Sequence, residues 1–450
     1  MRVMVMGLDS LPWSMYRRFR DNLPHFRQLV EGGVSAPLTS TIPPITIPAW
    51  MCMMTGRDPG EHGLYGFRNR TGRDYQTSRT ASSASFRGPA VWDVLSSRQK
   101  PSVLIGVPGT YPLRPFLGTA ISDFLTPPDA AEYTYPAEFK ETLKTIVDPY
   151  QFDITDYRSD RLADIQNEAF LMTDRRFQAI SWMSQNVPWE FFMAVEIGLD
   201  RMHHVFWNHM DPDHPLFVPN SRYGQALFRY YKFLDTKLGE MLARLPDDVL
   251  LLVVSDHGTQ GMAGGVFVND WLHRQGYLHF KRPVHDERFQ PELVDWAKTR
   301  AWAEGGYYAR MYLNVEGREP EGVVPASRFE AERDALKEQL ETLSCGARVF
   351  YPEEIYREVN GTAPDLLVYF GDLKWRALAS VGHVEIYSKE NDIGPDGANH
   401  AQEGVFIAYQ PRRLGPGRLD SARLLDVANT VLSELGYPGE VPGSNILEGR

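Results

Sequence analysis

A carboxylate and an imidazole stand side by side after the most apolar segment of the chain. Residues 249–254 are all Val or Leu, and Ser255-Asp256-His257-Gly258 follows them. Because Asp256 and His257 come after the predicted strand, in a turn that Gly258 allows, both side chains can turn to one side. A carboxylate oxygen and an imidazole nitrogen can together bind one cation. The segment indicates a metal site, although a polar turn with Asp256 capping a helix explains it equally well.

A second pair of the same residue types lies in residues 200–204, after the apolar segment 191–195. If this segment is helical, Asp200 and His204 are four residues apart and share one face, whereas His203 points elsewhere. Both could then reach one cation. The alternative is an aspartate that caps a helix, followed by two incidental histidines.

Thr46 is the candidate nucleophile. It lies in the segment PPITIP, residues 43–48, before a helix expected from 47 or 48 to 54. A threonine hydroxyl attacks poorly unless a base or a metal lowers its pKa. At a helix start, however, backbone N–H groups can also hold a phosphoryl oxygen. Taken alone, Thr46 is better interpreted as a plain helix cap.

Asp9 and His400 are weaker candidates when each is taken alone. Asp9 follows the apolar segment 3–7, and His400 precedes the apolar segment 404–409. An aspartate at a strand end is often only a helix cap, and a loop histidine is usually just solvated.

The elements that must position these side chains alternate between apolar strands and helices. Strands are predicted at residues 3–7, 102–107, 191–195, 249–254, 365–370 and 404–409. Helices are predicted at 26–31, from 47 or 48 to 54, and at 163–186, 223–245, 328–343 and 424–435. This order indicates an α/β fold with a largely parallel sheet flanked by helices. Functional groups of such sheets gather outside the carboxyl ends of the strands, where the candidates fall.

Composition excludes several classes of protein. The 450-residue chain is 43% hydrophobic and 23% charged, which is typical of a globular protein. A net charge of −11 argues against general nucleic-acid binding, and the two cysteines exclude a disulfide framework. No segment approaches the roughly 18 to 20 uninterrupted apolar residues of a membrane span, and the first residues do not form a signal peptide. We therefore expect a cytoplasmic protein with no membrane span.

In sequence order, the candidates resemble the metal and nucleophile residues of the alkaline phosphatase superfamily: Asp9, Thr46, Asp200, His204, Asp256, His257 and His400. The nearest branch is similar to the type I phosphodiesterases and nucleotide pyrophosphatases. Thr46-Ile47-Pro48 matches the nucleophile segment of that branch, and TGRDPGEHG at residues 55–63 matches a Thr-Gly followed by Pro and His-Gly. Residues 425–438 resemble its closing helix. The resemblance runs from Asp9 to nearly the C-terminus, with a poorly matched part between about 70 and 185.

The resemblance implies one alkaline-phosphatase-like catalytic domain over residues 1–450, with cap insertions within 70–185 and 265–395. It also implies two divalent metal ions, for which zinc is favoured and manganese or iron are alternatives. One ion would be held by Asp200, His204 and His400. The other would be held by Asp9, Asp256 and His257, and would also touch the Thr46 hydroxyl.

The implied reaction is hydrolysis of a small-molecule phosphate ester through a phospho-Thr46 intermediate. The two ions would clamp the attacking and leaving oxygens of an in-line displacement. The backbone N–H of Ile47 would help to stabilise the developing charge. Phosphodiesters or nucleotide pyrophosphate bonds are the favoured substrates.

The chain departs from this branch after the His-Gly pair. Phosphodiesterases of this group often place an asparagine there to contact a phosphoryl oxygen, but a direct alignment puts Phe67 at that position and Asn69 two residues late. Asn69 is therefore a candidate substrate contact beside Ile47, and the preferred ester stays open. For His62 and Arg68, packing or surface roles are at least as good an interpretation.

Three other ester hydrolases remain alternatives: a phosphomonoesterase, a phosphonate hydrolase and a sulfatase. A sulfatase would need a Cys or Ser with a nearby Pro and Arg, and no obvious arginine is placed to hold the dianion of a monoester. Diesters are therefore favoured. An alternative of another class is a non-catalytic binding protein in which the metal ions only stabilise the fold.

The predicted cap insertions would cover the site and set the choice of substrate. Tyr307-Tyr308 and Phe206-Trp207 could line a pocket, although such residues more often belong to a core. A homodimer is expected only because symmetric dimers are common.

Overall fold

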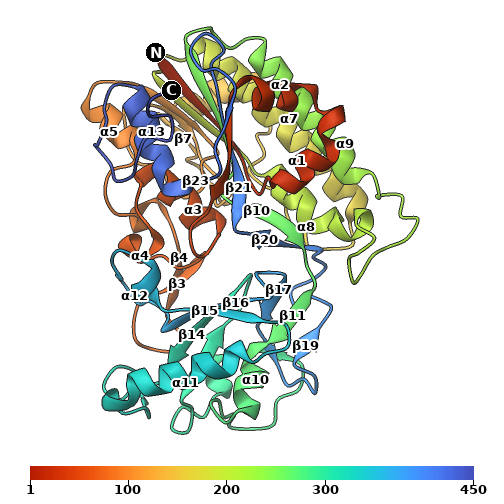
Figure 1. Cartoon of the computed structure of the whole chain (residues 1–450), viewed down its shortest axis with the longest axis vertical. Helices are drawn as coiled ribbons and strands as arrows, with labels where there is room; N and C mark the ends of the chain where they lie inside the picture. Colours follow the sequence, from red (N-terminus) through yellow and green to blue (C-terminus); the bar gives the residue numbers. More distant parts are fainter.

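A 10-stranded sheet runs through the larger part of the protein, which the computed structural model describes over residues 1–450 (Figure 1). Its centre is parallel: β1 (Arg2–Leu8) lies between β9 (Val249–Val254) and β8 (Phe191–Glu196), and β5 (Ser102–Ile105) and β6 (Gly118–Ile121) follow beyond β8. The antiparallel β21 (Glu403–Tyr409) joins β9 to β2 (Val34–Thr39). Short edge strands complete the sheet: β7 (Thr134–Tyr135), β22 (Gly417–Arg418) and β23 (Ala422–Arg423). The predicted α/β fold with a largely parallel sheet is confirmed.

The central strands are apolar on both faces because helices cover both faces of the sheet. Along β1, Met4 and Met6 pack into the core on one side, and Val3 and Val5 pack into the core on the other. The first face is covered by α1 (Trp13–Phe19), α2 (Pro24–Gly32), α7 (Leu162–Asn186), α8 (Gly198–Met210) and α9 (Ala226–Leu242). The second face is covered by α3 (Thr46–Thr55), α5 (Val91–Ser97) and α13 (Val427–Glu434).

Most predicted helices are found with shifted ends. α2, α3, α7 and α9 begin or end one to three residues away from the predicted bounds. Residues 424–426 form a short 3-10 turn instead of the first turn of α13. Capping and local hydrogen bonds, which decide helix ends, leave little trace in a hydrophobic pattern.

A second sheet of seven strands forms a smaller part of the protein, at the bottom of Figure 1. Its strand order is β13 (Ala301–Glu304), β14 (Ala309–Leu313), β16 (Leu366–Phe370), β17 (Trp375–Leu378), β11 (Gly264–Phe267) and β19 (Tyr387–Ser388), and β15 (Ala347–Phe350) pairs with β16. α10 (Val268–Arg274) and α11 (Phe329–Glu341) pack on it around a separate hydrophobic core. The strand predicted at 365–370 therefore belongs to this sheet and not to the central one. An apolar run predicts a buried strand but does not specify its partners.

Short two-stranded ladders complete the fold. β10 (Gly258–Gly261) pairs with β20 (Ala398–Ala401) between the two sheets, and the other ladders are β3 (Arg68–Arg70) with β4 (Ser78–Thr80) and β12 (Glu287–Arg288) with β18 (Ser380–Val381). The remaining helices are α4 (Pro59–His62), α6 (Phe139–Ile146) and α12 (Pro352–Ile355). The second sheet, with the helices and loops that connect its strands, spans most of the range 265–395. The role of this range as a cap stays a prediction.

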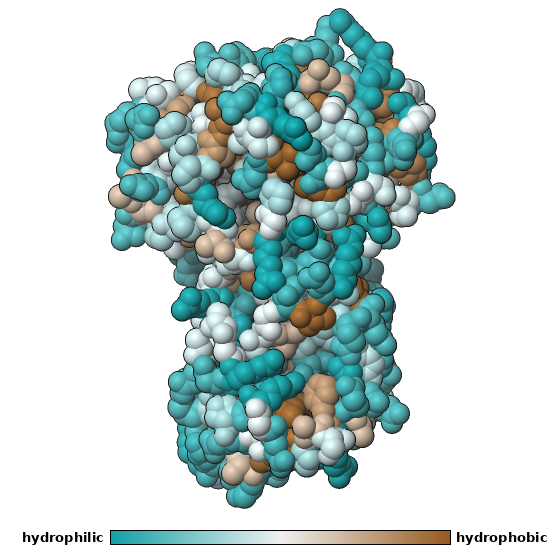
Figure 2. Space-filling model, turned by 90° about the vertical axis from the view of Figure 1, so that its left-hand side faces the viewer, coloured by the Kyte–Doolittle hydropathy of each residue, from teal (hydrophilic) through white to brown (hydrophobic).

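The surface is mostly hydrophilic, with small separate hydrophobic patches and a narrower waist between the two parts (Figure 2). None of the helices combines the length and the apolar composition that crossing a bilayer requires.

Candidate active site

Asp9 lies just after β1, beside the first turns of α3. Trp50 of α3 donates its indole N–H to Asp9 Oδ2 at 2.7 Å, so the helix fixes the orientation of this carboxylate. Ile45 is the N-cap of α3 and Thr46 is its first residue, so the Thr46 side chain does not serve as the cap. The buried Thr46 hydroxyl lies 3.3 Å from Nε2 of His257.

α8 presents Asp200 and His204 on one face, as their spacing predicts. His204 Nε2 lies 3.3 Å from Asp200 Oδ1, and the other oxygen of Asp200 accepts from Arg201 at 2.6 Å. The neighbouring His203 points away, with its Nε2 2.9 Å from the Tyr231 hydroxyl. The predicted helix and the separate orientation of His203 are confirmed.

The turn after β9 brings Asp256 and His257 to the same side. His257 Nε2 lies 3.3 Å from Asp256 Oδ2 and 3.6 Å from Asp9 Oδ1. Gly258 is needed there for close packing, because a Cβ atom would lie 2.1 Å from the carbonyl oxygen of Glu403. The sequence interpretation, in which this glycine bends the turn, gave a different reason for the same residue.

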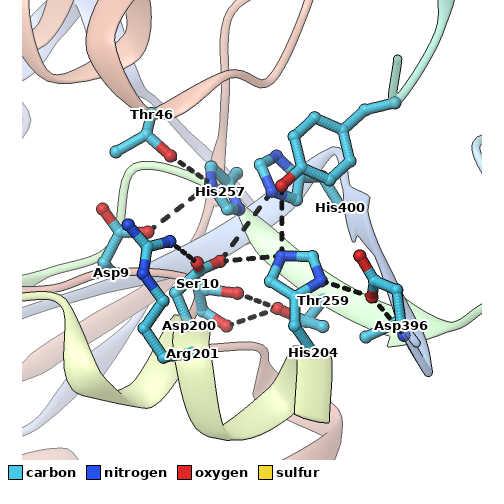
Figure 3. A network of polar contacts seen from close by, with 12 residues as sticks. Asp9, Ser10, Thr46, Asp200, Arg201, His204, His257, Thr259, Asp396 and His400 are labelled. Atoms are coloured by element: carbon cyan, nitrogen blue, oxygen red, sulfur yellow. Dashed lines mark hydrogen bonds and ion pairs between the residues drawn. The ribbon is translucent and has the colours of Figure 1, made fainter. Parts of the chain in front are cut away.

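β20 carries His400 to the cluster. The ring of His400 stacks on that of His257 with centroids 3.7 Å apart, and its Nε2 lies 3.8 Å from Asp200 Oδ1. Its Nδ1 donates to the carbonyl of Pro44 at 2.7 Å, which ties β20 to the segment before Thr46. All the predicted ligands and Thr46 therefore meet at one edge of the central sheet (Figure 3).

Each of the three carboxylates has one oxygen held by the protein and one that is free. The held oxygens accept from the Trp50 indole for Asp9, from Arg201 for Asp200, and from the Ser10 backbone N–H at 3.3 Å for Asp256. The opposite oxygens are buried without a hydrogen-bond partner: Asp9 Oδ1, Asp200 Oδ1 and Asp256 Oδ2. Buried polar atoms are rarely left in this state, so these oxygens mark a place for a ligand or an ion.

The three histidines are held in the same way. Nδ1 donates to the Gly258 carbonyl at 2.9 Å in His257, to the Pro44 carbonyl in His400, and to Asp396 at 2.8 Å in His204. In the neutral form of each ring Nδ1 carries the proton, and Nε2 then offers a lone pair to the cluster. Neutral imidazole nitrogens and carboxylate oxygens are donors that zinc accepts, so the residues present fit a pair of cations.

The ligand atoms fall into two groups that share His257. One group is Asp9, Asp256 and His257, and the other is Asp200, His257 and His400, with the atoms of each group within 4.8 Å of one another. His204 adjoins the second group through Asp200. The first group has the three residues that the sequence interpretation assigns to one ion, whereas the second has His257 where that interpretation has His204. The assignment of the ligands to two ions, with His204 on the second, stays a prediction.

Burial and mutual repulsion set the protonation of these groups. Burial raises the pKa of Asp9 and of Asp256, and their negative neighbours raise it further. Burial acts the same way on Asp200, but His204 outweighs it and holds the pKa of Asp200 well below its usual value. Burial lowers the pKa of His257 to about 4. A bound cation would favour ionised carboxylates and neutral imidazoles throughout the cluster.

The sequence interpretation missed a carboxylate behind His204. Asp396 is fully buried, accepts from His204, and also accepts from Arg158 at 2.9 Å and from Arg376 (Figure 3). Burial opposes a charge on His204, but Asp396, Tyr307 and Asp200 together outweigh it and raise the pKa of His204 to about 10. A carboxylate in this place fixes the ring orientation and tautomer of a ligand histidine. Asp396 lies in a loop with no pattern that could have revealed it.

Tyr307 reaches the cluster from the second sheet. Its ring stacks on His400 with centroids 3.8 Å apart, and its hydroxyl lies 3.4 Å from His204 Nε2. It lines a pocket of about 240 Å³, whose wall also includes Ile45, the residue before Thr46. Of the aromatic pairs singled out in the sequence, Tyr307-Tyr308 borders this pocket, whereas Phe206 and Trp207 lie in the core.

The two candidate substrate contacts differ in their placement. Ile47 is the second residue of α3, where a backbone N–H has no partner within the helix. The Asn69 amide is instead used in its own turn: Oδ1 accepts from the Tyr65 N–H at 2.6 Å and Nδ2 donates to the Gly66 carbonyl at 2.8 Å. The structure therefore corrects the expectation for Asn69, which braces the turn. Phe67, at the aligned position, lines the pocket but has no polar group to offer.

The central sheet places a cluster of possible metal ligands beside a buried threonine, which is the arrangement expected of a phosphoric ester hydrolase with the alkaline-phosphatase-like fold. The family model described as type I phosphodiesterase / nucleotide pyrophosphatase matches residues 3–397. The chain therefore belongs to the type I phosphodiesterase / nucleotide pyrophosphatase family. Among proteins of curated function, none matches it by sequence.

Solved structures with this fold include human and murine ectonucleotide pyrophosphatase/phosphodiesterase 5. The human protein superposes with a TM-score of 0.60 at 16% identity, covering 99% of this chain and 97% of that one. The murine protein gives a TM-score of 0.58 at 16% identity with the same coverage. An inactive threonine-to-alanine variant of the murine protein, in complex with AMP, gives 0.58 at 16% identity and covers 98% and 96%. This likeness shows a shared fold over nearly the whole chain.

Proposed function

We propose that the protein hydrolyses phosphodiester or nucleotide pyrophosphate bonds through a covalent phospho-Thr46 intermediate, with two divalent cations bound by the Asp–His cluster. The observation that carries this proposal is the set of buried, unpartnered ligand atoms beside the Thr46 hydroxyl. Family membership supports the reaction class. The inactive murine relative, which has alanine in place of a threonine and holds AMP, supports a threonine nucleophile and a nucleotide-like substrate.

Two cations, when bound, supply positive charge that lowers the pKa of Thr46 and stabilises charge on the attacking and leaving oxygens. The chain itself positions the reacting groups. The start of α3 fixes the Thr46 hydroxyl against His257, and the free N–H of Ile47 points a donor at a phosphoryl oxygen. The Thr46 oxygen bonds to phosphorus while the bond to the leaving oxygen breaks, and water then hydrolyses phospho-Thr46.

Zinc is the cation that this donor set favours, with manganese or iron as alternatives. A cytoplasmic location and a homodimer also stay predictions.

The test uses bis(p-nitrophenyl) phosphate as substrate for the full chain loaded with zinc or manganese. We expect turnover by the wild type, a loss on the order of 10³-fold or more in Thr46→Ala, and a much smaller loss in Thr46→Ser, which keeps the hydroxyl. Rapid quenching followed by mass spectrometry should find phosphate on Thr46.

Metal content and circular dichroism of the Thr46→Ala protein serve as the controls for folding and for an intact cluster. Turnover that survives this substitution would overturn the threonine mechanism. Turnover of p-nitrophenyl phosphate, an aryl phosphonate or an aryl sulfate in preference to the diester would overturn the proposed substrate class.

A further inference from the structure

The segment that holds a phosphoryl-contacting asparagine in related phosphodiesterases offers no free amide at that position in this protein. Phe67 occupies the aligned position, and the Asn69 amide is bonded to the backbone of its own turn. Besides Arg68, the polar side chains that line the pocket come from other segments and include Arg158, Tyr307, Arg310 and Arg376. The hairpin between β13 and β14 is the element of the second sheet that reaches the ligand cluster.

That hairpin fixes the backbone of Tyr307. Gly306 has a φ of 145°, a conformation that side chains other than glycine rarely adopt, and it exchanges backbone hydrogen bonds of 2.7 and 3.0 Å with Ala377. The carbonyl of Tyr307 accepts from the Asn399 side chain at 3.2 Å, next to His400. Both the β10–β20 ladder, which carries Asn399 and His400, and the second sheet therefore position this tyrosine.

The hydrogen bonds around the Tyr307 hydroxyl leave its proton free. Arg158 donates to the hydroxyl oxygen at 2.9 Å, and an arginine can only donate. The oxygen is thus the acceptor of that bond, and its own O–H must find another acceptor. Arg376 lies over the ring with its guanidinium carbon 4.4 Å from the centroid, and this contact restrains the side chain further.

The nearest nitrogen to that O–H is Nε2 of His204, at 3.4 Å. Nδ1 of His204 donates to Asp396, so Nε2 is the atom that would bind a cation when the ring is neutral. Once it binds a cation, Nε2 can no longer accept a hydrogen bond. The Tyr307 O–H would then be available to donate to an oxygen bound next to His204.

We propose that Tyr307 is a catalytic residue that donates a hydrogen bond to the leaving oxygen of the phosphate ester. This inference rests on the proposed function. Thr46 gives its hydroxyl proton to water as its oxygen bonds to phosphorus. The electron pair of the breaking bond stays on the leaving oxygen, and Tyr307 stabilises it while keeping its own proton. The leaving group takes its proton from water. The second sheet therefore supplies a hydrogen-bond donor for the reaction, in addition to any role as a cap.

The test compares Tyr307→Phe with the wild type on a series of aryl phosphodiesters that differ only in the leaving phenol. We expect kcat to fall on the order of 10²-fold for poor leaving groups and much less for p-nitrophenol, with KM changed little. A loss that is equal for all leaving groups, or no loss, would overturn the assignment to the leaving oxygen. Tyr312→Phe removes a hydroxyl from the same hairpin, at a side chain that packs against Trp302 and Arg70, and should not change the series.

A binding measurement separates this proposal from the proposed function. Zinc-loaded Tyr307→Phe should contain as much zinc as the wild type and bind inorganic phosphate about tenfold more weakly by calorimetry, because one donor to a charged oxygen is lost. Equal phosphate affinity would overturn the role of Tyr307. If the wild type turns over no diester, the proposed function fails, and the phosphate measurement then decides on Tyr307 by itself.

Discussion

Asp9, Asp200 and Asp256 are carboxylates with at most 1% of their surface exposed, packed within a few ångströms of one another. Removing an ionised carboxylate from water costs several kcal/mol unless the charge is paired. The protein offsets part of this cost with one donor to each carboxylate and leaves the other oxygen free. Bound cations would relieve the repulsion among these carboxylates, whereas a neutral ligand would leave it in place.

His62 is a buried histidine that lies outside the cluster, and its hydrogen bonds require a neutral ring. Its Nδ1 accepts from the Arg87 backbone N–H at 3.0 Å, and its Nε2 lies 3.0 Å from the Thr55 hydroxyl at the end of α3. Only the neutral ring can accept at Nδ1. Burial lowers the pKa of His62 from 6.5 to about 4.

His62 should therefore make stability depend on pH between 6.5 and 4. The unfolded state takes up the proton first as pH falls, so the contribution of His62 is fully present above pH 6.5 and is lost towards pH 4. The loss is on the order of 3 kcal/mol. Urea unfolding should be measured across this pH range for the wild type and for His62→Asn, which keeps a hydrogen-bond acceptor but does not titrate. The free energy of unfolding should change less with pH in the variant. Parallel curves would contradict the neutral assignment.

At the scale of elements, β1 and α3 form one unit in which packing sets the geometry of the site. Gly7 of β1 lies against Trp50, and a Cβ atom at Gly7 would lie 2.4 Å from the Trp50 ring. The Trp50 indole in turn holds Asp9. The absence of a side chain at Gly7 therefore helps to determine where the Asp9 carboxylate points.

Gly7→Ala should lower the stability by roughly 1–3 kcal/mol and weaken zinc binding, because the displaced Trp50 ring no longer holds Asp9. Thermal unfolding and zinc titration measure the two effects. Gly415→Ala is a matched control, since no atom lies within 4 Å of the position that its Cβ would take. Unchanged zinc affinity in Gly7→Ala would show that Asp9 does not depend on α3.

The sequence could predict the elements that carry strong local patterns. The apolar strands of the central sheet, the long helices and the ligand residues at strand ends all follow from hydrophobic periodicity, residue type and the family pattern. Asp396 and Tyr307 could not be predicted, because their roles come from contacts with His204 across a long stretch of chain. Asn69 was misassigned because a sequence shows an amide but not the turn that uses it.

At the scale of the whole molecule, the cluster joins segments from almost the full length of the chain. Its members come from the end of β1, from α3, from α8, from the turn after β9 and from β20, on both sides of the inserted second sheet. Cations in this place would link these segments and relieve the repulsion among the buried carboxylates. Metal binding should therefore be coupled to global stability as well as to activity.

Removal of the metal should lower the melting temperature of the whole protein. Binding to the folded state alone stabilises by about 4 kcal/mol when the free zinc concentration is 1,000 times Kd, because the unfolded chain has no assembled site. Differential scanning calorimetry should show a melting temperature several degrees lower after chelation, recovered on adding zinc. In Asp256→Asn, which loses a ligand charge, the response to zinc should be much smaller. A melting temperature that is independent of zinc in the wild type would mean that the cluster does not hold cations, because buried unpartnered carboxylates cannot gain such ligands without a gain in stability.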